Sequence, residues 1–315
     1  MKKLFSEKFN IILSSLMVSI TFLLPLENCS AFPVYAQQAY TNPREATGRL
    51  VCANCHLAQK PVAIEAPTSV LPDTVFEAVV KIPYADGLKQ VQGNGTKGGL
   101  NVGGIVVLPE GFKLAPKDRL STELKAKTKG VYIQPYSAEK PNILVVGPIG
   151  GDKHREIVFP IQSPSPGQDK GTFYIKYPIY VGGNRGRGQV NPNGEKTNNT
   201  LYTSSSAGKV QSIEKDEKGN FVVSIKNDKD IVASQTIPAG LDVSVRAGDF
   251  VKVDQPITND PNVGGFGQNE TEIVLQNPNR VIGLVAFFFT VVISQTFFVL
   301  KKKQFEKVQA AEMNF

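Results

Sequence analysis

Between residues 60 and 280 the chain consists of short apolar runs separated by clusters of Gly, Pro and Asn. Runs of this length are typical of β-strands, and the clusters between them are typical of turns. Away from the two ends of the chain, helical periodicity is confined to residues 42–57. The pattern therefore predicts an all-β fold built as a β-sandwich. The predicted strands are residues 75–82, 105–108, 142–146, 156–161, 172–177, 221–225, 242–245, 250–253 and 272–275.

A first long apolar run, residues 11–24, follows a lysine-rich start. This arrangement is typical of a secretory signal peptide. The small residues after the run predict removal of residues 1–31, so that the mature chain begins at Phe32. Cleavage after Ala36 or Ala39 is the alternative.

A second apolar run, residues 281–300, contains no charged residue. Its length is sufficient to cross a bilayer as a helix. Three consecutive lysines follow at once and predict that the tail, residues 301–315, stays on the cytoplasmic side. Residues 32–280 are then expected on the opposite side of the membrane.

The composition changes at residues 198–208, where Asn, Ser and Thr predominate. Such a change favours a domain boundary. We expect a large domain that begins with residues 32–199, a small inserted β domain at residues 200–257, and a return to the large domain at residues 258–280.

The formal net charge of +7 overstates the basic character of the exported part. The signal contributes +1 and the segment after Arg280 contributes +2, which leaves +4 for residues 32–280. Nucleic-acid binding usually requires a concentrated basic face. A mild excess spread over about 250 residues does not favour that class of function.

Cys52, Cys55 and His56 form a Cys-x-x-Cys-His motif, the pattern by which haem is attached covalently. The two thiols bond to the haem and the adjacent imidazole faces the iron. A thioredoxin-like redox pair would follow a buried strand, which this sequence does not offer. A structural zinc site needs four ligands, and the mature chain has too few Cys and His residues to favour one.

Most electron-carrying c-type cytochromes use methionine as the second axial ligand. Here Met1 and Met17 leave with the signal, and Met313 lies beyond the predicted membrane span. The nitrogen donors that remain are His154, a lysine, or the α-amine of Phe32. The amine is favoured because its ordinary pKa, about 7.7–8.0, is well below that of lysine.

Several segments resemble the cytochrome f family, the c-type haem subunits of photosynthetic cytochrome bf complexes, and the resemblance covers nearly the whole mature chain. The run that starts at Lys176 and the C-terminal tail are the most specific. The matching segments are Ala36-Gln-Gln, Asn42-Pro-Arg-Glu-Ala-Thr-Gly-Arg, Cys52 to Leu57, Lys81-Ile-Pro-Tyr, Leu108-Pro-Glu-Gly-Phe, Lys176-Tyr-Pro-Ile-Tyr-Val-Gly-Gly-Asn-Arg-Gly-Arg-Gly-Gln189, Asn262-Val-Gly-Gly-Phe-Gly-Gln and Lys301-Lys-Lys-Gln-Phe-Glu-Lys-Val-Gln.

The resemblance implies an elongated lumenal β-sandwich with a small inserted β domain, and one covalently bound haem c. It implies that His56 and the α-amine of Phe32 are the two axial ligands. Family members commonly begin with Tyr, and ligation through the main-chain amine survives the change to Phe. The residues that shield the haem in the family correspond to Phe32, Pro33, Tyr35, Pro148 and Pro192.

The family also has a buried water chain and a basic docking patch. By motif, the water chain corresponds to Gln90, Asn184, Gln189, Asn199 and Asn262. For each of these amides, ordinary turn capping is the competing interpretation. Lys89 and Lys97 match the docking patch, whereas Thr96 stands where a further lysine is common.

The resemblance implies a thylakoid protein that takes one electron from a Rieske iron–sulfur protein and passes it to plastocyanin or a soluble c-type cytochrome. The cytochrome b subunit and other bf-complex subunits would surround the anchor. One rival is a peroxidase- or reductase-like haem enzyme with an open iron site, which would bind carbon monoxide when reduced. Another is a tethered structural β-sandwich, which would carry no covalent haem.

Overall fold

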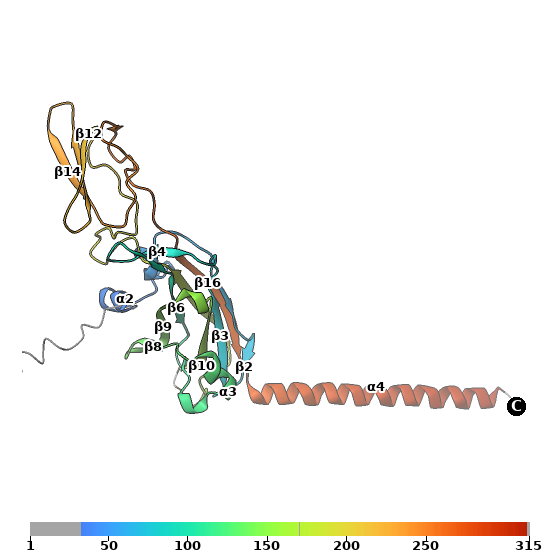
Figure 1. Ribbon diagram of the computed structural model, residues 1–315. Helices are drawn as coiled ribbons and strands as arrows, with labels where there is room; N and C mark the ends of the chain where they lie inside the picture. Colours follow the sequence, from blue (N-terminus) through green and yellow to red (C-terminus); the bar gives the residue numbers. More distant parts are fainter. Residues whose placement is uncertain (1–32, 170, 314–315) are drawn as a thin grey trace, which may run out of the picture. The chain divides into compact units, whose positions relative to one another are not determined.

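The computed structural model describes residues 33–169 and 171–313. Strands dominate these residues, and one long helix ends the chain (Figure 1). The all-β prediction is confirmed. Phe32, the proposed signal peptide and Met1 and Met17 lie outside the described residues.

The larger of the two principal sheets has six strands and is antiparallel, except where its short edge strand runs parallel to its neighbour. The central strands pair over long stretches, with Tyr180 opposite both Val107 and Glu270. In spatial order the strands are β2 (Ser69–Val70), β16 (Gly265–Leu275), β11 (Lys176–Arg185), β6 (Asn101–Val107), β9 (Lys140–Gly150) and β8 (Ile133–Ser137).

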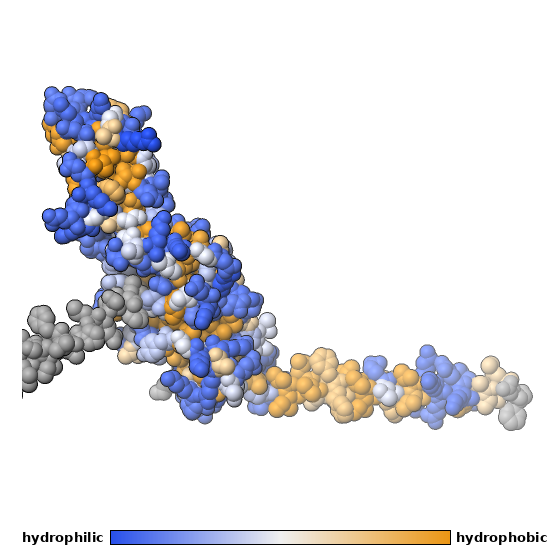
Figure 2. Space-filling view, in the orientation of Figure 1, coloured by the Kyte–Doolittle hydropathy of each residue, from blue (hydrophilic) through white to orange (hydrophobic). Residues whose placement is uncertain are grey.

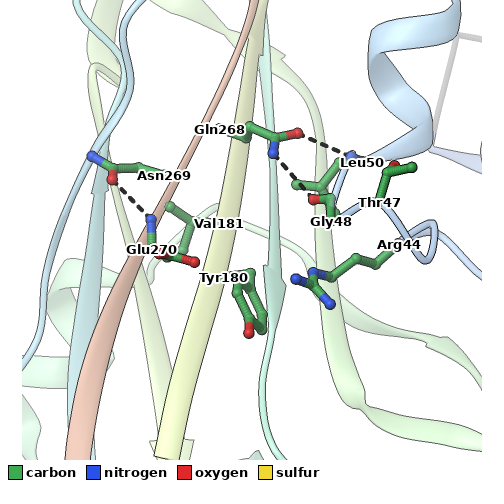
Figure 3. A pocket seen from close by; sticks show the side chains of 9 residues that line it. All are labelled: Arg44, Thr47, Gly48, Leu50, Tyr180, Val181, Gln268, Asn269 and Glu270. Carbon is green, nitrogen blue, oxygen red and sulfur yellow. Dashed lines mark hydrogen bonds between the residues drawn. The ribbon is translucent and has the colours of Figure 1, made fainter.

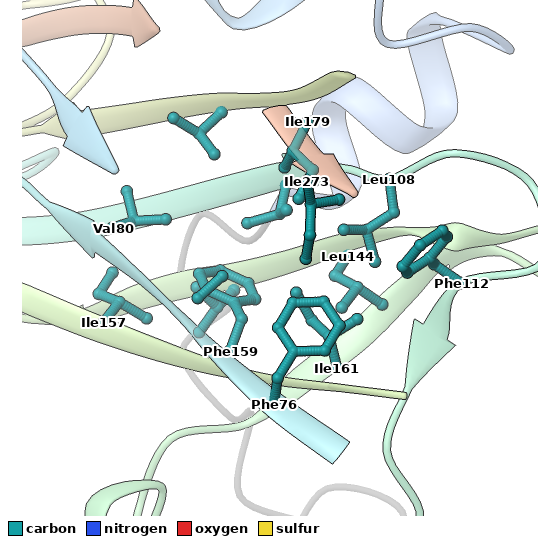
Figure 4. Packing of buried hydrophobic residues seen from close by; sticks show 14 of the residues in the cluster. Phe76, Val80, Leu108, Phe112, Leu144, Ile157, Phe159, Ile161, Ile179 and Ile273 are labelled. Carbon is teal, nitrogen blue, oxygen red and sulfur yellow. The ribbon is translucent and has the colours of Figure 1, made fainter. Parts of the chain in front are cut away.

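The second principal sheet has four antiparallel strands. Buried and partly buried residues alternate along β3, so that Phe76 and Val80 lie in the core, and Phe159 of the neighbouring strand is also fully buried. Apolar residues of both sheets pack together in one cluster, which makes this part a β-sandwich (Figure 4). In spatial order the strands are β1 (Ala63–Glu65), β3 (Val75–Lys81), β10 (Glu156–Gln162) and β7 (Lys113–Leu114).

A third sheet has its own apolar cluster, which includes Val223, Ile225, Ile237 and Val251. Separate burial of this kind is what a small folding unit needs. Its strands, in spatial order, are β14 (Val232–Ile237), β13 (Phe221–Lys226), β12 (Gly208–Lys215) and β15 (Phe250–Val251).

The remaining elements are short, apart from the last helix. Two strands form a hairpin with a tight turn between them, and the other elements are short helices. They are the hairpin strands β4 (Lys89–Val91) and β5 (Lys97–Gly99), and the helices α2 (Val34–Ala39), η1 (Val51–Asn54), η2 (Lys117–Arg119), α3 (Thr122–Lys127) and η3 (Gly151–Lys153).

The C-terminal helix α4 spans Pro278–Glu312. Among the described residues it is the one helix long and apolar enough to cross a membrane. Figure 2 shows its apolar first part and the polar segment that follows. The Asn277 side chain caps the helix by accepting hydrogen bonds from the backbone N–H groups of Asn279 and Arg280. Met313 lies at its far end, beyond the apolar run.

Three details of the sequence prediction are wrong. Residues 42–57 do not form a helix: Gly48 has a φ of +87°, Arg44 pairs with Leu50, and only η1 is helical. Residues 172–175 form turns before β11, because the Thr172 N–H bonds to Asp169 and the Phe173 N–H bonds to the Tyr177 hydroxyl. Residues 242–245 make an isolated bridge at Val243 instead of a strand.

The sandwich core is expected to be sensitive to loss of volume at Phe159, which is fully buried between the sheets. Phe159→Ala should lower the free energy of unfolding by about 3–5 kcal/mol. The control Tyr132→Ala removes an exposed ring and should change it by less than about 0.5 kcal/mol. Guanidinium unfolding of the detergent-solubilised protein, followed by circular dichroism, measures both. Equal midpoints would contradict the assigned core.

Candidate functional site

The Cys-x-x-Cys-His motif lies on the 3-10 helix η1 and the turn that follows it. The backbone N–H groups of Cys55 and His56 both donate to the Cys52 carbonyl oxygen, at 3.3 and 3.0 Å. The Val51 N–H bonds to the Pro43 carbonyl oxygen at 2.9 Å, which closes the segment before the motif into a loop. The motif is therefore a tight turn in which both thiols and the imidazole project from one short segment.

The segment before the motif is held by Gln268 on β16 (Figure 3). The side-chain oxygen of Gln268 accepts from the Leu50 N–H at 2.9 Å, and its amide nitrogen donates to the Gly48 carbonyl at 3.1 Å. Beside this contact is a pocket of about 380 Å³, in which the Arg44 guanidinium lies 3.7 Å from the centre of the Tyr180 ring. A strand far along the sequence thus fixes the entry to the motif.

The segment after the motif is held by Gln189, which follows the end of β11. The Gln189 N–H donates to the Cys55 carbonyl at 2.8 Å, and the Gln189 side-chain oxygen accepts from the Leu57 N–H at 2.9 Å. A Cβ atom at Gly188 would lie 3.1 Å from the Cys55 carbonyl oxygen and 3.3 Å from its Cβ. The close approach therefore favours glycine at this position.

The helix α2 is fastened to the sheet by Tyr136 on β8. The hydroxyl of Tyr136 lies 2.6 Å from the carbonyl oxygens of both Ala36 and Tyr40, so that its one proton serves two acceptors. The Gln37 side chain returns a bond to the Tyr136 carbonyl at 2.7 Å. Burial raises the pKa of the Tyr136 hydroxyl to about 12, and it remains a donor at neutral pH.

Apolar side chains bring α2, η1 and the six-stranded sheet together. Leu50, Ile105, Ile143, Val145 and Phe266 form the buried centre of this cluster, together with Tyr136. The partly buried residues packed against it are Ala36, Cys52, Ala53 and Val107. Cys52 of the motif thus packs on the same apolar surface as Ala36 of α2.

The donor atoms of the motif fit covalent haem attachment. Both thiols are free, and the buried Nδ1 of His56 has no hydrogen-bond partner in the described part of the chain. Burial raises the pKa of the Cys52 thiol to about 12 and lowers the pKa of His56 to about 4. The imidazole is therefore neutral at pH 7, the form that ligates iron. Within residues 33–169 and 171–313, no cluster of three or more metal-ligating side chains occurs.

Three of the five amides predicted to line a water chain lie together beside the motif. The Arg187 carbonyl accepts from the side chains of Gln189 and Asn199, at 3.0 and 2.8 Å. The Asn199 side chain also donates to the Asn262 side-chain oxygen at 3.4 Å. Gln189 and Asn199 are buried, so they form a polar group inside the fold.

The other two amides have different surroundings. Gln90 is fully buried, and neither polar atom of its side chain has a partner in the described structure. Its Oε1 lies 3.4 Å from the Cβ position of Gly186, on the stretch that leads to Gln189. The side-chain oxygen of Asn184 lies instead against Gly103 on the neighbouring strand β6.

Two residues that the sequence analysis did not select join this polar group to other elements. The Arg187 guanidinium donates to the Val91 carbonyl at 2.9 Å and to the Asn198 side chain at 2.6 Å. The Asn198 side chain in turn donates to the Gln92 carbonyl at 2.8 Å. The Gly-Asn-Arg-Gly-Arg-Gly run was a signal for Arg187, because it places arginine among residues with little side-chain volume.

The remaining predicted residues occupy several elements. Pro33 precedes α2, and Tyr35 lies exposed on it. Pro148 lies on β9, and Pro192 lies in an exposed turn after Gln189. The alternative ligand His154 directs its Nδ1 to the Gly150 carbonyl at 2.7 Å.

The two predicted docking lysines lie on one hairpin. Lys89 starts β4 and Lys97 starts β5, where it is paired with Val91. Both lysines are exposed. The neighbouring Gln90 and Val91 side chains are buried, so the hairpin is packed against the rest of the fold while its two lysines stay exposed.

Two family models match the chain, apocytochrome F N-terminal over residues 32–186 and apocytochrome F C-terminal over residues 198–315. Cytochrome f of Porphyra purpurea is 68% identical over 286 residues, covering 91% of this chain and 89% of the relative. Cytochrome f of Pyropia yezoensis is 63% identical, covering 95% and 94%. Cytochrome f of Emiliania huxleyi is 62% identical, covering 98% and 99%.

Tyr136→Phe should loosen α2 while leaving the packing of the ring intact. The loss of the buried hydroxyl is expected to cost about 0.5–1.5 kcal/mol locally. Hydrogen exchange should therefore speed up at the Gln37 and Tyr40 amides, which bond to the Pro33 and Ala36 carbonyls. Tyr132→Phe, which changes an exposed tyrosine, is the matched control. Unchanged exchange in α2 would show that Tyr136 does not hold the helix.

Proposed function

The chain belongs to the cytochrome f family, and we propose that it accepts single electrons from a Rieske iron–sulfur protein and passes them to plastocyanin or a soluble c-type cytochrome. As a family member it is a membrane-anchored c-type cytochrome of the cytochrome bf complex and holds one covalent haem c. It is an electron-transfer protein, and we infer that the complex as a whole oxidises plastoquinol and reduces plastocyanin.

The turn at Cys52, Cys55 and His56, clamped from both sides, is the observation that supports this role. Haem c supplies a one-electron iron couple at the site. The chain holds the attachment segment through Gln268 before the motif and Gln189 after it. A rigid segment limits the rearrangement that accompanies each change of charge, which favours electron transfer over chemistry on a substrate.

The proposed second axial ligand is the α-amine of Phe32, which lies outside the described residues. Its support comes from the residues that follow. Tyr136 fastens α2 to β8, and Ala36 of α2 packs on the same apolar cluster as Cys52. Cleavage after Ala36 would remove half of α2 and cleavage after Ala39 all of it, and either would remove these contacts of Ala36. Cleavage after Ala31 preserves them.

The proposed shield around the haem consists of Pro33, Tyr35, Pro148 and Pro192, with the Phe32 side chain. Their side chains are apolar and carry no hydrogen-bond donor, apart from the Tyr35 hydroxyl. Their function would be to exclude water from the iron. Exclusion of water holds a charged centre in a medium of low dielectric constant.

The proposed water chain involves Gln90, Asn184, Gln189, Asn199 and Asn262. The Asn199 side-chain oxygen and both polar atoms of Gln90 are buried without partners in the described structure. Buried polar atoms in this situation usually bond to internal water. The contact between Gln189 and the Cys55 carbonyl joins this polar group to the haem segment.

The proposed topology places the β domains in the thylakoid lumen and the tail on the opposite side. We also propose a large domain of residues 32–199 and 258–280 with a small domain of residues 200–257. The separate apolar cluster of the third sheet supports this division. The cytochrome b subunit and other subunits of the complex are the proposed neighbours of α4.

The proposed docking patch contains Lys89 and Lys97 on the β4–β5 hairpin. Charge steering is expected to be modest, because Thr96 replaces a further lysine and acidic side chains dilute the basic surface of the third sheet. Those acidic residues are Glu214, Asp216 and Glu217, beside Lys215 and Lys218.

Lys97→Ala should lower the association rate with an acidic plastocyanin by about twofold to fivefold at low ionic strength, because it removes a steering charge. Stopped-flow oxidation of the reduced protein at several salt concentrations measures the rate. The control Lys125→Ala removes an exposed lysine from α3 and should leave the rate unchanged. A steep salt dependence that Lys97→Ala leaves unchanged would refute the patch. Failure to reduce either proposed acceptor would refute the function.

Ala31→Arg should block cleavage and remove the amine ligand, because small residues are required at the cleavage site. We expect the retained chain to keep its haem thioethers but to show an altered absorption spectrum. Ala39→Arg, which alters the competing site, should leave the N-terminus at Phe32 and the spectrum unchanged. N-terminal sequencing of the purified holoprotein checks each product. A wild-type chain that begins at Tyr40 would contradict the assigned ligand.

A further inference from the structure

Three large apolar side chains are exposed where the six-stranded sheet leads into α4. The exposed fractions are 45% for Leu71, 62% for Phe173 and 50% for Ile175. The three residues come from two separate segments, one after β2 and one before β11. Large exposed apolar residues that gather at one place usually mark a contact surface.

Backbone hydrogen bonds join both segments to the end of β16. The Leu275 N–H donates to the Ile175 carbonyl at 3.1 Å, and the Gln276 N–H donates to the Val70 carbonyl at 2.8 Å. The Tyr177 hydroxyl bonds to both the N–H and the carbonyl of Phe173 at 2.9 Å, which fixes the turn that exposes this ring. The exposed side chains are therefore held by the last residues before the membrane helix.

The link to the helix is very short. Only Gln276 and Asn277 separate the end of β16 from the first residue of α4, Pro278. The apolar run begins at Val281, about 5 Å further along the helix axis at 1.5 Å per residue. Segments bonded to Leu275 and Gln276 must therefore lie close to the level at which the chain enters the membrane.

We propose that Leu71, Phe173 and Ile175 form a lipid-contacting edge that lies in the boundary between the headgroups and the acyl chains. Aromatic and long apolar side chains are favoured at this depth. Lys176, which is paired with Glu272 of β16, and Arg280 have long side chains that can reach the polar headgroup layer. The edge would limit the tilting of the β-sandwich on its anchor. The inference rests on the membrane anchor and is independent of the electron-transfer partners.

The chain contains no tryptophan, so that a single introduced tryptophan reports its own surroundings. The full-length holoprotein with Phe173→Trp is reconstituted alone into phosphatidylcholine vesicles, with and without bromine on the acyl chains. We expect bromination to reduce the fluorescence at position 173 and the emission to be blue-shifted. The ratio of the fluorescence intensities in the two kinds of vesicle removes the effect of energy transfer to the haem, because the same variant is measured in both.

Phe250→Trp is the matched control, since Phe250 is equally exposed, at 61%, but lies on the third sheet. Its fluorescence should not respond to bromination. Leu71→Trp tests the second segment independently, in case Phe173→Trp disturbs the turn. Equal responses at positions 71, 173 and 250 would overturn the proposal.

A neighbouring protein subunit is the competing occupant of this surface. Phe173→Trp is therefore also measured in the purified bf complex. Fluorescence that bromine quenches in neither the vesicles nor the complex, with an emission that is blue-shifted only in the complex, would assign the surface to that subunit. The same result would overturn the lipid contact. Oxidation of the haem by the soluble acceptor, measured in the same vesicles, reports separately on the proposed function.

Discussion

The carbonyl oxygen of Cys55 is the point on which the candidate site depends, because it joins the proposed haem segment, the turn at Cys52 to Leu57, to a segment more than 130 residues later. It accepts from the Gln189 N–H at 2.8 Å, and the Val190 N–H lies 3.4 Å away. The approach is this close only because Gly188 carries no side chain. The position of the turn is thereby set by the exit of β11, whose register with β6 and β16 is fixed over many residue pairs.

The same exit segment supports the hairpin with the proposed docking lysines. Arg187 bonds to the Val91 carbonyl and Asn198 bonds to the Gln92 carbonyl, both on or next to β4. The Asn198 side chain also donates to the carbonyl of Ala239, which follows strand β14 of the third sheet, at 3.4 Å. Buried polar groups that share partners favour one arrangement, since each displaced member leaves others unpaired. The proposed haem segment and the hairpin are therefore held by neighbouring residues, Gln189 for the first and Arg187 with Asn198 for the second.

Local patterns predicted β3 and β13 well, where burial alternates along much of the strand, and also β10, which is an almost continuous run of buried residues. The helical prediction for residues 42–57 was wrong, although apolar residues recur there at helical spacing. These residues lie in a loop, in which Gly48 adopts a positive φ and bonds through its carbonyl to Gln268. The short helix α2 has few local signals, and Tyr136 stabilises it from another element. Tertiary contacts of this kind leave no periodicity in the sequence.

The residues proposed to attach the haem are predictable, because two thioethers and an axial imidazole require them to lie close together in the sequence. Gln268, Tyr136 and Arg187 are not, since their roles depend on contacts with distant backbone atoms. A side chain that bonds to the backbone of a distant segment can be recognised only in the folded structure, where both segments are placed.

Strand β16 links the proposed haem segment to the C-terminal helix, because it holds that segment at Gln268 and leads into α4 after Leu275. Seven residues separate these positions, which corresponds to about 23 Å along an extended strand. Pairing with β11 along its length keeps β16 from bending freely. A paired strand, and not a flexible linker, thus lies between the proposed haem segment and the start of α4. An electron carrier that must meet partners at a defined height above the membrane needs such a constraint.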